Sequence, residues 1–202
     1  MTRIKLCGLR EPCDIEAANA LAPDYIGFVM APKSKRYITS EKAAALKGLL
    51  APGIQAVGVF VNEAPETVAA LFRDGVIDIA QLHGDEDGDY IMRLRRLACL
   101  PVIRAFRISA GSDLAAALRS PADYILLDSG AGTGTVFDWN LIRKIERPYF
   151  LAGGLNADNV GSAIRALRPF AVDVSSGIET NGRKDKRKMA AFAAAVRKEE
   201  NS

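Results

Sequence analysis

The sequence predicts an α/β protein in which strands and helices alternate to form a single (β/α)8 barrel over residues 1–202. Apolar segments rich in β-formers recur about every 20 to 30 residues and alternate with amphipathic segments, as βα units do. Two of the last apolar segments end in glycine or serine, at the positions where such barrels form a phosphate site. An open doubly wound sheet is the alternative fold, and the even spacing of the segments disfavours it.

Eight strands are expected where short runs of β-branched and aromatic residues precede a glycine or a polar residue. These runs are Arg3–Cys7, Tyr25–Met30, Gln55–Val61, Ile77–Leu82, Val102–Arg107, Tyr124–Leu127, Tyr149–Ala152 and Ala171–Val174. Because side chains alternate along a strand, Lys5 shares the inward face with Cys7, and Asp173 shares it with Ser175.

A helix is expected after each strand, and its start is marked by a proline of the first turn or by a capping side chain. The predicted starts are Pro12, Thr39 or Ser40, Pro65, Asp85 or a neighbour, Ser112, Asp138, Asn156, and Asp185 or a neighbour. Together the predicted strands and helices account for the whole chain without a linker.

The composition indicates a globular protein, with 49% hydrophobic residues, 25% charged residues and a net charge of +3. No long block of like charge predicts nucleic-acid binding, and no apolar run is long enough to predict a membrane span. Three cysteines, an odd number, argue against a disulfide framework and for a cytoplasmic location. With one histidine and no Cys-x-x-Cys motif, we expect no metal site.

The two late strand ends predict an anion site. Gly153 and Gly154 follow one strand, and Ser175, Ser176 and Gly177 follow the next. Small side chains allow backbone N–H groups to approach a phosphate. Ordinary tight turns are the alternative for each stretch alone, and the pair favours phosphate.

The other candidate residues also lie at strand ends, which form the working face of such a barrel. Cys7 and Asp128 come from roughly opposite strands, and this placement suits proton transfer at two atoms of one substrate. Arg36 is a candidate for holding a substrate carboxylate in a bidentate contact. Gln81, His83 and Asp173 are candidate substrate contacts. The alternatives are a buried structural cysteine, an aspartate cap, a solvated arginine and a histidine in a turn.

Several stretches resemble the phosphoribosylanthranilate isomerase family of tryptophan biosynthesis, and they span the chain in order. They are residues 4–8, 27–37, 57–62, 81–86, 126–128, 132–139, 152–160 and 172–179. The resemblance implies a cofactor-free Amadori rearrangement of a phosphosugar–anthranilate substrate, with Cys7 as general base and Asp128 as general acid. It also implies that Arg36 holds the anthranilate carboxylate, and that the backbone around residues 153–154 and 175–177 holds the phosphate. Neither the resemblance nor the sequence decides between a monomer and a homodimer.

Other functions remain as alternatives. A barrel synthase of the same pathway, such as indole-glycerol-phosphate synthase, is expected to use a lysine and glutamates, where this chain has Cys7 and Asp128. The same cysteine disfavours a sugar isomerase with two aspartates. A non-catalytic barrel that binds phosphosugars is the third alternative, and the retention of both Cys7 and Asp128 argues against it.

Overall fold

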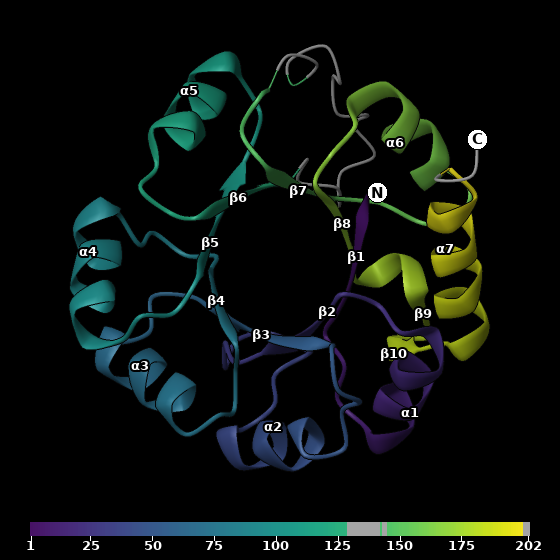
Figure 1. Ribbon diagram of the computed structural model, residues 1–202, viewed down its shortest axis with the longest axis horizontal. Helices are drawn as coiled ribbons and strands as arrows, with labels where there is room; N and C mark the ends of the chain where they lie inside the picture. The colour runs from purple at the N-terminus through teal and green to yellow at the C-terminus, as the bar shows by residue number, and fades with distance from the viewer. Residues whose placement is uncertain (129–141, 143–144, 200–202) are drawn as a thin grey trace.

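The computed structural model describes residues 1–128, 142 and 145–199. In this part of the chain eight parallel strands form a closed barrel, in which each strand pairs with the next and β8 pairs with β1. Figure 1 shows the strands as an inner ring surrounded by helices. The strands are β1 Arg3–Cys7, β2 Tyr25–Val29, β3 Gln55–Phe60, β4 Ile79–Leu82, β5 Val102–Arg107, β6 Tyr124–Asp128, β7 Tyr149–Ala152 and β8 Ala171–Val174. The predicted (β/α)8 fold is confirmed.

The predicted strands agree with the observed ones to within two residues, and the largest difference is at the start of β4. The sequence predicted a start at Ile77, whereas pairing with β3 begins at Ile79, opposite Val57. The backbone N–H groups of Val76 and Ile77 instead donate to the carbonyl oxygen of Leu71. The chain is therefore still held by the end of the preceding helix where the apolar run begins.

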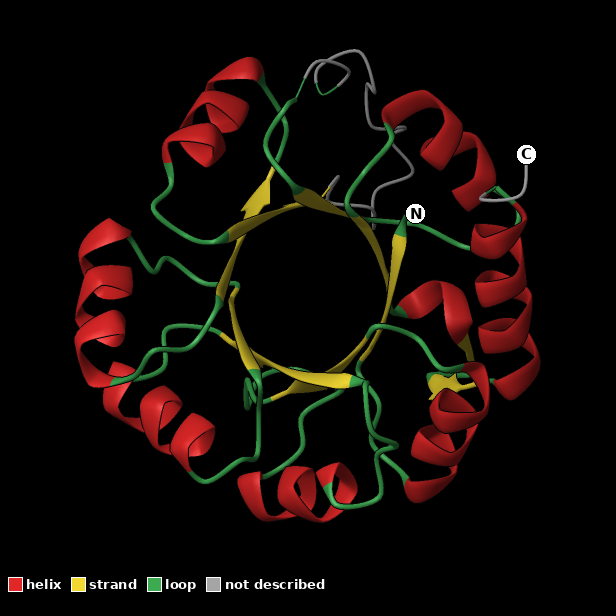
Figure 2. Ribbon diagram, viewed as in Figure 1, coloured by secondary structure: helices red, strands yellow, loops and turns green. Residues whose placement is uncertain are grey.

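The described helices lie outside the ring of strands, as Figure 2 shows. They are α1 Pro12–Leu21, α2 Ser40–Lys47, α3 Pro65–Arg73, α4 Gly88–Leu97, α5 Gly111–Arg119, α6 Val160–Leu167 and α7 Lys186–Lys198. The glycine-rich loop of residues 129–135 and the helix expected from Asp138 lie outside the described residues. Among the helices that are described, none is long and apolar enough to cross a membrane.

Several of the predicted caps are present. Thr39 accepts a hydrogen bond from the N–H of Lys42, and Asp185 accepts from the N–H groups of Arg187 and Lys188. These bonds satisfy backbone donors that the first turn of a helix leaves free.

Two predicted helix starts were wrong. Helix α5 begins at Gly111, before Ser112, because the Asp113 carboxylate accepts from N–H groups that precede the helix. Helix α6 begins at Val160, because Asn156 forms a separate turn. In this turn the Asn156 side chain accepts hydrogen bonds from the backbone N–H groups of Asp158 and Asn159. In both cases a side chain able to cap a helix bonds locally in a different way.

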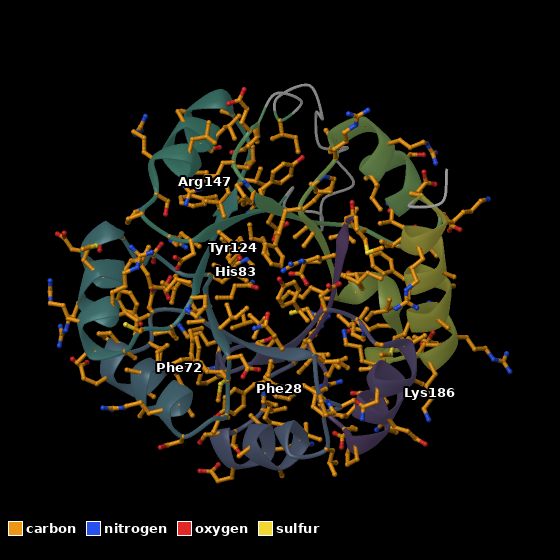
Figure 3. The ribbon with its side chains drawn as sticks, viewed as in Figure 1. Phe28, Phe72, His83, Tyr124, Arg147 and Lys186 are labelled. Carbon is orange, nitrogen blue, oxygen red and sulfur yellow. The ribbon has the colours of Figure 1, made fainter. Side chains whose placement is uncertain are left out.

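Apolar side chains fill two regions, inside the barrel and between the strands and the helices. Figure 3 shows Tyr124 and His83 inside the ring of strands, whereas Phe28 and Phe72 lie outside it. Four aromatic rings within the barrel pack with centroids 5.1 to 5.8 Å apart, which is the range of favourable aromatic contacts. They are Tyr25, Tyr124, Phe150 and Phe170. They lie at or near the N-terminal ends of β2, β6, β7 and β8, so aromatic side chains fill this end of the barrel.

The connection from β8 to α7 contains elements that were not predicted. A 3₁₀ turn, η2, spans Ser176–Ile178, and a hairpin of β9 (Glu179–Thr180) and β10 (Arg183–Lys184) follows it. The hairpin lies between α1 and α7 in Figure 1. Its two turn residues, Asn181 and Gly182, both have positive φ, the geometry for which Asn-Gly is favoured.

Candidate active site

One pocket opens at the C-terminal ends of the strands and contains most of the predicted site residues. Cys7 ends β1, Asp128 ends β6, and His83 and Ser175 follow β4 and β8. Arg36 and Gly177, which were also predicted, do not line it. The lining residues are Cys7, Val29, Val59, Gln81, His83, Asp128, Ala152, Gly153, Gly154, Leu155, Asp173, Ser175 and Ser176.

The Cys7 thiol occupies space that Gly27 on the neighbouring strand leaves open. Cys7 and Gly27 are register partners, and a Cβ atom on Gly27 would lie 2.7 Å from the Cys7 sulfur. Burial raises the pKa of the Cys7 thiol, and attraction to the Lys5 ammonium offsets only part of that rise. The Lys5 ammonium by itself would lower this pKa, but burial in the folded barrel has the larger effect.

Lys5 lies one inward position before Cys7 and forms a buried ion pair. Its ammonium is 3.0 Å from each carboxylate oxygen of Asp173, and its side chain is 0% exposed. Burial is the largest single effect and by itself would lower the pKa of Lys5, but the Asp173 carboxylate and the Cys7 thiol together outweigh it, and the pKa is raised. Asp173 lines the pocket as predicted, yet its described contacts are with Lys5.

Asp128, His83 and Gln81 form a second polar group in the pocket. His83 Nε2 lies 3.6 Å from Asp128 Oδ2, and His83 Nδ1 lies 3.1 Å from Gln81 Nε2. When the Gln81 amide donates to Nδ1, the proton of neutral His83 is on Nε2 and faces Asp128. The buried Gln81 Oε1 has no hydrogen-bond partner among the described residues. It is therefore an acceptor that a bound ligand can satisfy.

The two glycine-containing loops approach each other closely at this end of the barrel. Gly153 and Gly154 have φ values of 95° and 63°, which favour glycine. A Cβ atom on Gly177 would lie only 2.0 Å from the carbonyl oxygen of Leu155. Gly177 thus allows the β8 loop to pack against the β7 loop, and Ser175 and Ser176 face the pocket beside Gly153 and Gly154.

Arg36 lies beside the pocket and is held by an acidic residue of the hairpin. Its Nε and Nη2 atoms donate to the two carboxylate oxygens of Glu179 at 2.7 and 2.8 Å. Lys184 Nζ donates to the same carboxylate at 2.7 Å. Burial by itself would raise the pKa of Glu179, but these two cations lower it to about 2.

The sequence did not predict Lys184 as a site residue. Glu179 appeared there only as the last residue of the stretch 172–179. A signal for them was present, because Asn181-Gly182 predicts a tight hairpin that brings its flanking residues together. Among the described residues, no group of three or more His, Cys, Asp or Glu side chains is placed to hold a metal ion.

A thiol and a carboxyl group that face one bound molecule can exchange protons with two of its atoms. The fold and the pocket together are those of a (β/α)8-barrel enzyme, with a thiol and a carboxyl group at one pocket. Residues 4–195 match the model of the N-(5′-phosphoribosyl)anthranilate (PRA) isomerase family. The chain belongs to this family.

Curated relatives and solved structures agree with this assignment. The chain is 46% identical to N-(5′-phosphoribosyl)anthranilate isomerase of Dechloromonas aromatica, with 100% of this chain and 99% of that protein covered. It is 43% identical to the Endomicrobium trichonymphae protein of the same name, with 94% and 95% covered. The structure of the Thermotoga maritima phosphoribosyl anthranilate isomerase superposes with a TM-score of 0.89 at 39% identity, covering 98% of this chain and 100% of that one.

A further solved structure shows an isomerase of this family with a bound ligand. It is a phosphoribosyl anthranilate isomerase in complex with reduced 1-(o-carboxyphenylamino)-1-deoxyribulose 5-phosphate. Its TM-score is 0.87 at 38% identity, and the match covers 98% of this chain and 100% of that one.

Proposed function

We propose that this protein catalyses the Amadori rearrangement of N-(5-phosphoribosyl)anthranilate to 1-(o-carboxyphenylamino)-1-deoxyribulose 5-phosphate, a step of tryptophan biosynthesis, with Cys7 as general base and Asp128 as general acid. The observation that carries the proposal is that Cys7 and Asp128 end different strands and line one pocket. Membership of the isomerase family, and the complex of a family member with the reduced product, support the choice of substrate.

The reaction begins with two proton transfers that these groups can perform. Asp128 donates a proton to the furanose ring oxygen, and the bond between that oxygen and C1 breaks to give an open-chain iminium. The Cys7 thiolate then removes the proton from C2, which gives an enolamine. The enolamine then tautomerises to the ketone: C1 takes up a proton and the C2 hydroxyl loses one, so the step is a net isomerisation that needs no oxidant or cofactor.

The charged ends of the substrate are bound by groups away from the reacting carbons. Backbone N–H groups around Gly153, Gly154, Ser175, Ser176 and Gly177 hold the phosphate. This role is supported by the close packing of the β7 and β8 loops and by the positive φ values of the two glycines. Arg36 holds the anthranilate carboxylate.

The remaining polar residues of the pocket orient the substrate and the catalytic groups. Gln81, with its unsatisfied Oε1, and His83 contact the hydroxyl-bearing part of the substrate beside Asp128. The Asp173 carboxylate, already bonded to Lys5, borders the pocket.

The proposal extends to the organisation of the protein. Residues 1–202 act as one domain, in the cytoplasm, as a monomer or a homodimer whose ligand is this one small molecule. The closed barrel that spans residues 3–174 supports one domain, and the three cysteines, all free, are suited to a reducing compartment.

The test is turnover of freshly generated phosphoribosylanthranilate, followed by the loss of its fluorescence. The wild type, Cys7→Ser and Asp128→Asn are compared, with Cys99→Ser as the control for replacing an exposed cysteine. We expect each site variant to lose at least about 100-fold in kcat while it still binds the reduced product, since general acid–base groups contribute 10²–10⁴-fold. The control should keep the wild-type rate.

The other outcomes have clear meanings. An inactive wild type that binds the reduced product would identify a phosphosugar-binding barrel instead of an enzyme. Active Cys7→Ser and Asp128→Asn variants would show that the proton transfers are performed elsewhere.

A further inference from the structure

The β9–β10 hairpin builds a cluster of three charged side chains beside Cys7. Glu179 and Lys184 are register partners in the hairpin, and Arg36 comes from the loop after β2. The Glu179 side chain is only 8% exposed and binds both cations. Two cations and one anion leave a formal charge of +1, so the cluster favours the approach of one further anion.

The contact between Arg36 and Glu179 uses only one edge of the guanidinium group. The bonds run from Nε and Nη2, which is the side-on arrangement. A guanidinium has five N–H donors, so two on Nη1 and one on Nη2 remain. Within the described part of the chain Nη1 makes no hydrogen bond. With respect to the described residues, the Nη1–Nη2 edge is therefore open to a second, end-on carboxylate.

The cluster is held in place next to β1, the strand that ends in Cys7. A Cβ atom on Gly8, the residue after Cys7, would lie 2.7 Å from Arg36 Cδ and 3.5 Å from Lys184 Nζ. Lys184 also donates to the carbonyl oxygen of Ser175 at 2.9 Å, which ties the hairpin to the end of β8. The Arg36 side chain thus packs against the backbone of Gly8, next to Cys7.

A second arginine fastens the hairpin to the loop that carries Arg36. Arg10 donates to the carbonyl oxygen of Gly182 in the hairpin turn and to that of Lys35, each at 2.7 Å. The relative position of Glu179 and Arg36 is therefore set by backbone contacts as well as by their own ion pair.

We propose that Glu179 is a positioning residue for substrate recognition: it holds Arg36 by the Nε–Nη2 edge, so that the Nη1–Nη2 edge is oriented in advance to bind the anthranilate carboxylate. This inference rests on the proposed function, in which Arg36 binds that carboxylate. A free arginine side chain has many rotamers, and binding a ligand would have to order them. The ion pair removes this requirement before the substrate arrives.

The test compares two substrates that differ only in the ring carboxylate, N-(5-phosphoribosyl)anthranilate and N-(5-phosphoribosyl)aniline, with conversion followed by phosphorus NMR. For Glu179→Gln we expect kcat/KM with the carboxylated substrate to fall about 10- to 100-fold, mainly through KM, because misplaced binding groups have effects of this size. With the aniline substrate the fall should stay below about threefold.

The matched control is Glu66→Gln, which removes an exposed carboxylate of α3 that is paired with Arg93 of α4. This variant should leave kcat/KM unchanged with both substrates. If Glu179→Gln does not fold, Glu179→Asp, which keeps the charge on a shorter side chain, takes its place. It is assessed by the ratio of kcat/KM for the carboxylated substrate to kcat/KM for the aniline substrate.

An equal loss of kcat/KM with both substrates would overturn the inference, because it would show that Glu179 acts only on the general structure of the site. Failure of the proposed function would look different. In that case the wild type itself would convert neither substrate, or would show no preference for the carboxylated one, and Arg36→Lys would leave that ratio unchanged.

Discussion

The ammonium group of Lys5 lies 3.0 Å from both carboxylate oxygens of Asp173, at the inward position next to Cys7 on β1. The two residues are 168 positions apart in the chain and meet because β1 and β8 close the barrel. Burying two charges costs free energy that their mutual attraction has to repay. The pair is therefore expected to contribute more to the electrostatic environment of the Cys7 thiol than to the free energy of folding.

Removal of one partner of this pair should destabilise the protein strongly. Lys5→Met leaves the Asp173 charge buried without a partner, and we expect a loss of about 3–5 kcal/mol in the free energy of unfolding. Lys5→Met/Asp173→Leu removes both charges and should recover most of that loss. Urea denaturation measures all three proteins. The exposed pair Arg93–Glu66 is the control, since Arg93→Met should cost about 1 kcal/mol or less. Equal losses at the two sites would contradict the prediction.

The pH dependence of activity should reflect the raised pKa of Cys7. The base is the thiolate, and its fraction grows as the pH rises towards the pKa of the thiol. Because burial raises that pKa, the Cys7-dependent limb of kcat/KM should still be rising above about pH 8.5, the ordinary thiol value. Cys7→Ser should lack this limb. A plateau reached below neutral pH would show that the thiolate is stabilised and that burial does not dominate.

Gly27→Ala should impair catalysis and also lower stability somewhat, because the added Cβ atom would lie 3.1 Å from the Cys7 Cα atom. The new methyl group would lie 2.7 Å from the Cys7 sulfur, so the thiol must rotate away from its position. We expect kcat to fall about 10- to 100-fold because a catalytic group is displaced, and binding of the reduced product to be retained. Steady-state kinetics and isothermal titration measure the two effects. An unchanged kcat would place the reacting base elsewhere.

Gly177→Ala should disrupt the anion site. Its Cβ atom would lie 2.0 Å from the Leu155 carbonyl oxygen, and a backbone atom cannot move aside as a flexible side chain can. We expect the melting temperature to fall by several degrees, as for an overpacking of about 1–3 kcal/mol, and inhibition by inorganic phosphate to weaken. Gly111→Ala, with nothing within 4 Å of the added atom, is the control and should lower neither the melting temperature nor the inhibition by phosphate. Tight inhibition by phosphate in Gly177→Ala would place the anion elsewhere.

The alternation of strands and helices could be predicted because it depends on local pattern. Runs such as Tyr149–Ala152 and Ala171–Val174 have the same bounds in the structure as in the prediction, since a buried strand between polar or glycine breaks has few alternatives. The helix starts at Gly111 and Val160 were mispredicted, because Asp113 and Asn156 each have several local hydrogen bonds to choose from.

The residues of the pocket could also be predicted in large part. Strand ends are identified by local sequence, and the barrel fold brings all the C-terminal ends to one face. This reasoning placed Cys7, Asp128 and His83 at the pocket that the structure shows.

What the sequence by itself determined was therefore the order of the elements, which residues of a strand share a face, and most of the side chains at the C-terminal strand ends. Only the tertiary structure decided which charged groups pair. Lys5 with Asp173 and Arg36 with Glu179 join positions 168 and 143 residues apart, and no local pattern encodes such distances. It also decided the direction of the Cys7 pKa shift, because the cost of desolvation depends on how completely the closed barrel excludes water from the thiol.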